Sequence, residues 1–360
     1  MAARASEDVR PEGGTAARAR FPYLAGRRRT LDDPNFGPSP LLTSSAHGGV
    51  SPPPPRDDGG LPSPSPSAAP QSPQSPPHSP LPRASNGAIK LHQTSYVKKL
   101  VERFLPHGPL EKVQRGSLPY SSDFLKHIAD ALALPPESYP ELVRPMQERL
   151  GCLMYAATST RCDIAFPVHY LCKCLQRPTP ELIRETDLIL SYLARLPSAG
   201  LTYTREQMRL SGFSDASWET AASTSGWVVL WQSAALSWGS RKQKSIALSS
   251  CEAEIIALSE AAKDVVYLRK LIRGLGEPEP GPSTLATDSQ SARDVSYNPE
   301  HHDRMKHVQR RHFFIRDMVE SFEIEVPFVR TADNIADFFT KPMKSANQFH
   351  AFRKTIMNEL

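Results

Sequence analysis

Four acidic residues stand in segments whose patterns predict strands or helices packed in a core: Asp215, Glu254, Asp288 and Asp337. An ionised carboxylate on a buried face is costly unless a positive charge compensates it. A divalent metal ion provides that compensation, is bound by carboxylate oxygens, and also does chemistry. The placement of these acids therefore indicates a metal centre, although each acid also has a simpler explanation.

Glu254 is distinguished from Glu252 by helix geometry. Ser249 and Glu252 match the S-x-x-E capping box, in which two side chains satisfy backbone N–H groups at the start of a helix. Glu254 falls in the second turn and begins one helix face that continues with apolar residues: Leu258, Ala261, Val265, Leu268 and Ile272. We expect Glu252 to cap the helix and Glu254 to point at a sheet. The alternative is a frayed helix start that leaves Glu254 in water.

Asp215 and Asp288 both belong to predicted strands. The alternation from Gly212 onward places Asp215 on the same face as Phe213. The alternative is an Asp that opens a turn at D-A-S. Asp288 ends the alternating strand Ser283–Thr287 just before a helix, where a carboxylate suits either a metal ligand or a helix N-cap.

Asp337 lies in a short helix that is predicted to begin at Asp333 and to be stopped by Pro342. Asp333 or Asn334 can cap this helix, which places Asp337 one turn in. It is the fourth acid at the end of an element.

The elements that must position these acids are three strands and a long helix between Ser211 and Ile272. Further along the chain, Arg304–Ser321 predicts a basic amphipathic helix and Glu323–Arg330 a last strand. Earlier in the chain, a short strand and a helix are predicted between Ile89 and Phe104, and helices between Tyr139 and Leu196. The earlier helices carry no cluster of ligand residues, so we expect them to be scaffold.

Composition divides the chain further. Of its 360 residues, 35 are proline, and its formal net charge is +5. About half of the prolines precede Ala84, largely in Ser-Pro repeats with few apolar residues, so we expect residues 1–87 to be a disordered tail. No apolar run is long enough for a transmembrane helix, and no secretory signal is recognisable. Five cysteines without paired C-x-x-C spacing indicate no zinc site and an intracellular protein of the cytoplasm or nucleus, not a secreted one.

Six motifs follow one another between about Gly200 and Lys341: SGFSDASW, STSGWVVL, ALSWGSRKQKSIALSSCEAEIIALSEAAKDVVYLRKLI, ATDSQSA, KHVQRRHFFIRD and TADNIADFFTKP. In this order they resemble the ribonuclease H domain of copia-type LTR retrotransposon Pol polyproteins. KLHQTSYVKKLVERF and ERLGCLMYAATSTRCDIAF, which precede them, resemble the end of the same family's reverse transcriptase. The resemblance covers most of the chain from Ile89 onward.

This resemblance implies an α/β, ribonuclease H-like fold with a mixed five-stranded sheet flanked by helices. It divides the chain into a disordered tail (1–87), a mainly helical reverse-transcriptase thumb or connection remnant (88–200), a ribonuclease H-like domain (201–345) and a C-terminal helical extension (346–360).

The activity that the resemblance implies is hydrolysis of the RNA strand of RNA–DNA hybrids. The family's four catalytic and metal-binding acids match Asp215, Glu254, Asp288 and Asp337 position by position. They would hold two Mg²⁺ ions, or Mn²⁺ in their place, which suit an in-line phosphodiester displacement. We expect no small-molecule cofactor and no membrane partner.

Basic residues are the expected substrate contacts. Arg241, Lys242 and Lys244 follow the third strand, and Lys306 and His307 lie on the basic helix. Lysine and arginine side chains bind phosphates of either strand, whereas RNA is told from DNA through its 2′-hydroxyl groups.

The chain also departs from the family. The segment Trp218–Ala222 is short and lacks the basic residues that the family has there, while Gln309 and Phe313 replace an Asp and a His. The Y-x-D-D turn of a polymerase is missing, so we expect no reverse transcriptase activity from this fragment.

Two other functions stay open at this point. One is a catalytically inactive relic of the same fold that binds nucleic acid or is purely structural. The other is a DNA-strand-transfer enzyme on the related integrase fold, which is disfavoured because Glu254 precedes Asp288 in the chain.

Overall fold

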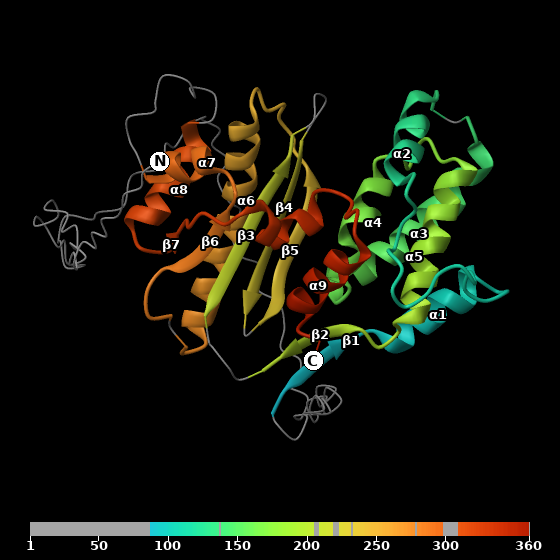
Figure 1. Ribbon diagram of the computed structural model, residues 1–360, viewed down its shortest axis with the longest axis horizontal. Helices are drawn as coiled ribbons and strands as arrows, with labels where there is room; N and C mark the ends of the chain where they lie inside the picture. Colours follow the sequence, from blue (N-terminus) through green and yellow to red (C-terminus); the bar gives the residue numbers. More distant parts are fainter. Residues whose placement is uncertain are drawn as a thin grey trace, which may run out of the picture. The chain divides into compact units, whose positions relative to one another are not determined.

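A mixed five-stranded sheet positions the predicted acids. The computed structural model describes residues 87–136, 138–204, 209–218, 223–231, 233–277, 279–297 and 309–359, all within one unit that comprises residues 76–360. The strands lie in the order β5-β4-β3-β6-β7 (Figure 1). Their bounds are β3 (Leu210–Ser217), β4 (Thr224–Trp231), β5 (Ala234–Lys242), β6 (Ser283–Thr287) and β7 (Ile324–Glu325). The α/β class and the mixed five-stranded sheet expected from the sequence are confirmed.

The register of the sheet brings two of the acids together. β3 and β4 are antiparallel, with Asp215 opposite Gly226, whereas β3 and β6 are parallel, with Ser214 opposite Thr287. Because parallel strands end at the same edge of a sheet, the residues that follow this last pair, Asp215 and Asp288, lie side by side.

The long helix α6 (Ser250–Gly274) covers one face of the sheet. The five apolar residues of its predicted stripe are buried against this face together with Leu285 and Val229. α7 (Gln290–Tyr297) and α8 (Gln309–Glu320) complete this layer. The helix begins as expected, because the Ser249 hydroxyl accepts from the backbone N–H of Glu252 at 3.1 Å. The Glu252 carboxylate accepts from Leu248 N at 2.8 Å, one residue earlier than the usual capping box.

The other face of the sheet shares one hydrophobic core with the helices of residues 88–200. These are α1 (Thr94–Phe104), α2 (Phe124–Ala133), α3 (Pro140–Ser159), α4 (Ala165–Cys172) and α5 (Pro180–Arg195), with the C-terminal helix α9 (Ala346–Met357). Val228, Leu230 and Phe339 from the sheet side belong to this core. It crosses both predicted boundaries, near residues 200 and 345, so the division into domains stays a prediction.

A second, two-stranded sheet lies beside these helices. β1 (Ile89–His92) and β2 (Gly200–Tyr203) pair antiparallel, with Leu91 opposite Leu201. The strand at Ile89 was expected from its alternation, but its partner more than 100 residues later was not.

A buried polar network attaches α9 to the helices. Arg161 and Asp163 form an ion pair at 2.7 Å and are almost fully buried. Tyr192 donates to Asp163 at 2.7 Å, and Arg353 of α9 donates to the Tyr192 hydroxyl at 3.1 Å. Because a buried charge is tolerated only when it is paired, this network fixes α9 in one position.

Several predicted elements differ from those observed. The predicted strand Glu323–Arg330 is reduced to β7 and an isolated bridge between Thr287 and Phe328, because Pro327 has no N–H to donate to a ladder. The predicted short helix at Asp333 is two 3₁₀ helices, Thr331–Asp333 and Ile335–Phe339.

One observed helix was not predicted, and two predicted segments lie outside the described residues. Helix α2 was not predicted. Residues 304–308 of the predicted basic helix and the predicted disordered tail up to residue 86 lie outside the described residues. Across the described residues, no helix combines the length and apolar character needed to span a bilayer. All five cysteines are free thiols.

Gly226 lets the second 3₁₀ helix, η4 (Ile335–Phe339), approach the sheet. A Cβ atom at this position would lie 2.5 Å from Thr340 Cγ2 and 2.9 Å from Phe339 Cβ, closer than van der Waals contact allows. Since Gly226 is paired with Asp215, the approach brings the end of η4 to the acid on the neighbouring strand.

Replacing this glycine tests the close approach. Gly226→Ala should lower the free energy of unfolding by about 1–3 kcal/mol, as expected for an overpacked site. Gly151→Ala is the matched control, because a Cβ at this position on α3 meets nothing within 4 Å. It should stabilise the helix by about 0.5–1 kcal/mol. Urea denaturation of both variants measures the difference, and equal effects would contradict the approach of η4 to β4.

Candidate metal centre

Three of the four predicted acids converge at the carboxyl edge of β3 and β6. One carboxylate oxygen from each of Asp215, Glu254 and Asp288 lies within 4.8 Å of the other two. They come from β3, from the second turn of α6 and from the residue after β6. An all-oxygen donor set of this kind suits a hard cation such as Mg²⁺.

Asp215 is held inside the sheet and does not open a turn. It is 4% exposed and accepts a hydrogen bond from the Thr340 hydroxyl. Burial raises the pKa of its carboxyl group, and the charge of Asp288 raises it further, although the Thr340 hydrogen bond and the charge of Lys341 oppose this. The carboxylate is therefore oriented by the protein but short of positive charge.

Glu254 points at the sheet from α6, as expected, and is not a frayed residue in water. Its Oε2 atom is buried and has no hydrogen-bond partner among the described residues. Burial raises its pKa to about 9, and the charges of Asp215 and Asp288 contribute, while a hydrogen bond from the Ala216 backbone opposes them. An orphaned buried oxygen of this kind is what a metal ion would satisfy.

Asp288 does not cap the helix that follows it. The cap of α7 is Ser289, whose hydroxyl accepts from the backbone N–H of Ala292 at 3.2 Å. Asp288 Oδ1 instead accepts from Asn334 Nδ2 at 3.1 Å, and the same amide group donates to the backbone oxygen of Ser214. Asn334 therefore links the ends of the two parallel strands.

Asp337 lies beside this group of three but is not part of it. It is 5% exposed in η4 and forms an ion pair with Lys341, with 2.7 Å between Oδ1 and Nζ. Burial raises its pKa to about 7, and the charge of Asp215 adds to the increase, while Lys341 opposes it. The structure thus brings Asp215, Glu254 and Asp288 together and places Asp337 next to them with a cation of its own.

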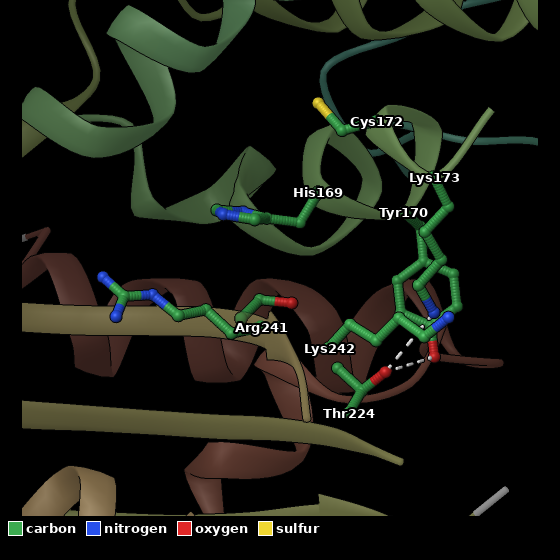
Figure 2. Close-up of a pocket in the computed structure, with 8 residues that line it drawn as sticks. His169, Tyr170, Cys172, Lys173, Thr224, Arg241 and Lys242 are labelled. Carbon is green, nitrogen blue, oxygen red and sulfur yellow. Dashed lines mark hydrogen bonds between the residues drawn. The ribbon is translucent and has the colours of Figure 1, made fainter. Parts of the chain in front are cut away.

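The predicted substrate contacts lie at different places. Arg241 and Lys242 line a pocket between β5 and α4 (Figure 2), and Lys244 is exposed in the loop after β5. Lys306 and His307 lie outside the described residues.

Three residues act on the acids in ways that the sequence did not reveal: Asn334, which was expected only as a possible helix cap, and Thr340 and Lys341, which were assigned no role. Asn334 precedes Asp337 by three residues, and Thr340 and Lys341 follow it by three and four, all within the motif TADNIADFFTKP. On a helical turn this spacing places side chains together, which was the signal available.

Both the chemistry of the donor atoms and their geometry suit a bound metal ion. The donors are carboxylates, they approach within reach of a common ion, and at least one buried oxygen lacks a partner. Bringing like charges this close is unfavourable unless a cation is bound or protons are taken up.

Comparison with known proteins places the chain among transposon polyproteins. No protein-family model matches it. The chain is 31% identical over 259 residues to the retrovirus-related Pol polyprotein from transposon TNT 1-94 of Nicotiana tabacum, a match that covers 70% of this chain and 19% of that protein. It is 33% identical over 223 residues to the Pol polyprotein from transposon RE1 of Arabidopsis thaliana, covering 60% and 15%. The chain thus spans less than a fifth of the length of these relatives.

A third relative is shorter. Secreted RxLR effector protein 161 of Plasmopara viticola is 37% identical over 129 residues, which cover 34% of this chain and 91% of that protein.

Two solved structures are similar in part. The N-terminal RNase H domain of rv2228c from Mycobacterium tuberculosis, a fusion with maltose binding protein, has 15% identity and a TM-score of 0.29, covering 41% of this chain and 98% of that chain. The foamy viral protease-reverse transcriptase in complex with an RNA/DNA hybrid has 16% identity and a TM-score of 0.35, covering 62% and 28%.

The raised pKa values predict how stability depends on pH without metal. A carboxyl group whose pKa is higher in the folded state binds more protons there than in the unfolded chain. The free energy of unfolding in EDTA should therefore fall as the pH rises from about 4.5, the ordinary value for Glu, towards about 9. Denaturation at a series of pH values measures this fall.

Two variants of α6 identify the carboxyl group that causes this pH dependence. Glu254→Gln should reduce the pH dependence, because the group that titrates has been removed. Glu252→Gln should keep the wild-type pH dependence, because its carboxylate caps the helix at Leu248 and lies outside the cluster. If the free energy of unfolding of Glu254→Gln depends on pH as steeply as that of the wild type, Glu254 is not the group that titrates.

Proposed function

Because this chain belongs to the family of copia-type, retrovirus-related Pol polyproteins of transposons, we propose that it carries a ribonuclease H-type endonuclease that hydrolyses the RNA strand of RNA–DNA hybrids. The observation that carries the proposal is the convergence of Asp215, Glu254 and Asp288 at one edge of the sheet. An intracellular location belongs to the same proposal.

The proposed cofactor is a pair of Mg²⁺ ions, which Mn²⁺ can replace. Asp215, Glu254 and Asp288 would hold them, with Asp337 as the fourth acid. When bound, divalent cations supply Lewis-acid chemistry, which draws charge from a phosphodiester and makes water a better nucleophile at neutral pH.

The residues of the chain itself have separate parts in this proposal. The Thr340 hydroxyl fixes the orientation of Asp215, and the Asn334 amide fixes that of Asp288. Lys341 favours the ionised form of Asp337 through their ion pair. A carboxylate held in one orientation needs no reorganisation when charge develops on the substrate, which is the basis of electrostatic preorganisation.

Phosphate contacts would come from basic residues. We assign this role to Arg241, Lys242 and Lys244 in and after β5, and to Lys306 and His307 of the predicted basic helix. These contacts would position the hybrid and carry no sequence preference.

Cleavage of a labelled RNA–DNA hybrid tests the activity. Asp215→Asn and Glu254→Gln should each lower the rate in Mg²⁺ at least about 100-fold, because metal ions contribute several kcal/mol of transition-state stabilisation. At temperatures well below its melting temperature, Glu252→Gln should cleave the hybrid at nearly the wild-type rate. A wild-type chain that binds the hybrid without cutting it would instead favour an inactive relic of the fold.

Metal binding is tested separately from activity. Mg²⁺ should raise the melting temperature of the full chain, and at 100 times its dissociation constant it should add about 2.7 kcal/mol to the free energy of unfolding. The increase should be much smaller in Asp215→Asn and should not occur with NaCl of equal ionic strength. Equal stabilisation of both proteins would show that the acids do not hold the ion.

A further inference from the structure

A pocket of about 320 Å³ lies between helix α4 and the outer strand β5 (Figure 2). It is lined by residues from two distant segments of the chain: His169, Tyr170, Cys172, Lys173, Thr224, Ser240, Arg241 and Lys242. The first four belong to the end of α4 and the residue after it, and the others to β4 and β5. The pocket therefore joins the helical segment to the sheet that carries the acids.

The lining of the pocket is positively charged. Lys173, Arg241 and Lys242 are cations, His169 is a fourth basic residue, and none of the eight lining residues is acidic. Burial lowers the pKa of His169, and the charge of Arg241 lowers it further. Among the described residues, neither Arg241 nor Lys242 forms an ion pair with an acid. Such a concentration of one charge attracts anions.

Hydroxyl groups add neutral donors to this charge. Ser240 is fully buried, and its Oγ atom has no hydrogen-bond partner among the described residues. The Thr224 hydroxyl lies 3.2 Å from the Tyr170 hydroxyl and accepts from Lys173 Nζ at 3.4 Å. A buried donor without a partner is costly, and a bound oxyanion would satisfy it.

Strand geometry decides which groups act together. Lys242 is paired with Thr224, so alternation places both on the same face as Ser240, toward α4. Arg241 is directed to the other face, where its guanidinium lies 5.3 Å from the Trp227 ring centre. The ammonium groups and the two hydroxyls therefore form the interior of the pocket, and Arg241 contributes at its rim.

The pocket is connected to the acids through Tyr170 and Thr340. The Tyr170 hydroxyl donates to the backbone oxygen of Thr340 at 3.4 Å, and the Thr340 side chain donates to Asp215. A nucleic-acid strand presents a phosphate at every nucleotide. A strand lying at the acids could thus place another of its phosphates in the pocket.

We infer that this pocket binds one backbone phosphate of the nucleic acid, with Lys173, Lys242 and Ser240 as its main donors. The choice of nucleic acid as ligand rests on the proposed function. Charge-assisted hydrogen bonds from two lysines and a hydroxyl are suited to phosphate oxygens. The inference gives α4, outside the ribonuclease H-like segment, a direct part in holding the substrate.

Binding of a fluorescent RNA–DNA hybrid to the full chain tests the inference. Ca²⁺ replaces Mg²⁺ and cleavage is followed in the same samples. The double variant Lys173→Gln/Lys242→Gln should bind about tenfold more weakly or worse. The logarithm of the association constant for the hybrid falls linearly with the logarithm of the salt concentration. The magnitude of this slope should decrease by about 0.9 in the double variant, as expected for the loss of one phosphate contact. Lys99→Gln/Lys126→Gln, which alters two exposed lysines on α1 and α2, is the control of equal charge change and should bind as the wild type does.

Ser240→Ala provides a variant that should not disturb folding. Removing a hydroxyl without a partner should leave the melting temperature unchanged or raise it, and should still weaken hybrid binding a few-fold. If the wild type binds the hybrid and both pocket variants bind it equally well, the inference is overturned while the proposed function stands. If the wild type binds no hybrid, the proposed function fails.

Inorganic phosphate distinguishes the source of the ligand. Titration calorimetry with phosphate alone should give weak binding that Ser240→Ala and the double lysine variant reduce. Phosphate binding that these variants abolish, together with unchanged affinity for the hybrid, would assign the pocket to a free phosphate and overturn its role in holding a strand. Equally tight binding of polyglutamate would show that the pocket does not select phosphate.

Discussion

Repulsion between buried carboxylates is the interaction on which the rest of the structure depends. Burial and mutual charge raise the pKa of Asp215 and Glu254, and the positive charge of Lys341 offsets only part of the increase at Asp215. Acids in such a position must be held by something other than their attraction for one another. Hydrogen bonds from Thr340 and Asn334 orient the carboxylates, and the apolar packing of α6 against the sheet supplies the stability that the cluster costs.

The arrangement also explains why the residues around the acids are small or polar. Gly226, on the strand next to Asp215, leaves room for η4. Asn334 links Asp288 to the end of β3 by hydrogen bonds to both. On the same face of β4 and β5, Thr224, Ser240 and Lys242 line the basic pocket that reaches α4. Negative charge for metal and positive charge for phosphate are thus separated by Thr340 and Tyr170, whose hydrogen bonds keep the two regions adjacent.

Much of this was predictable from the sequence, for identifiable reasons. Period-2 and period-3.6 patterns located β6 and α6, and the capping box separated Glu252 from Glu254, because these signals are local. The reduced last strand, the pairing of β1 with β2 and the pocket between α4 and β5 depend on contacts between residues far apart. Local patterns carry no information about such pairs. The roles of Thr340 and Asn334 became visible only when η4 was placed against the sheet.

The position of α9 has a consequence for how the protein is made. This helix, held by Arg353 through Tyr192, and the backbone N–H of Met343, bonded to the Tyr120 hydroxyl, complete a core begun by residues translated much earlier. During vectorial synthesis the nascent chain therefore keeps an open apolar surface until these late residues emerge from the ribosome. A translation product that stops short of them would leave η4 without its support beside Asp215.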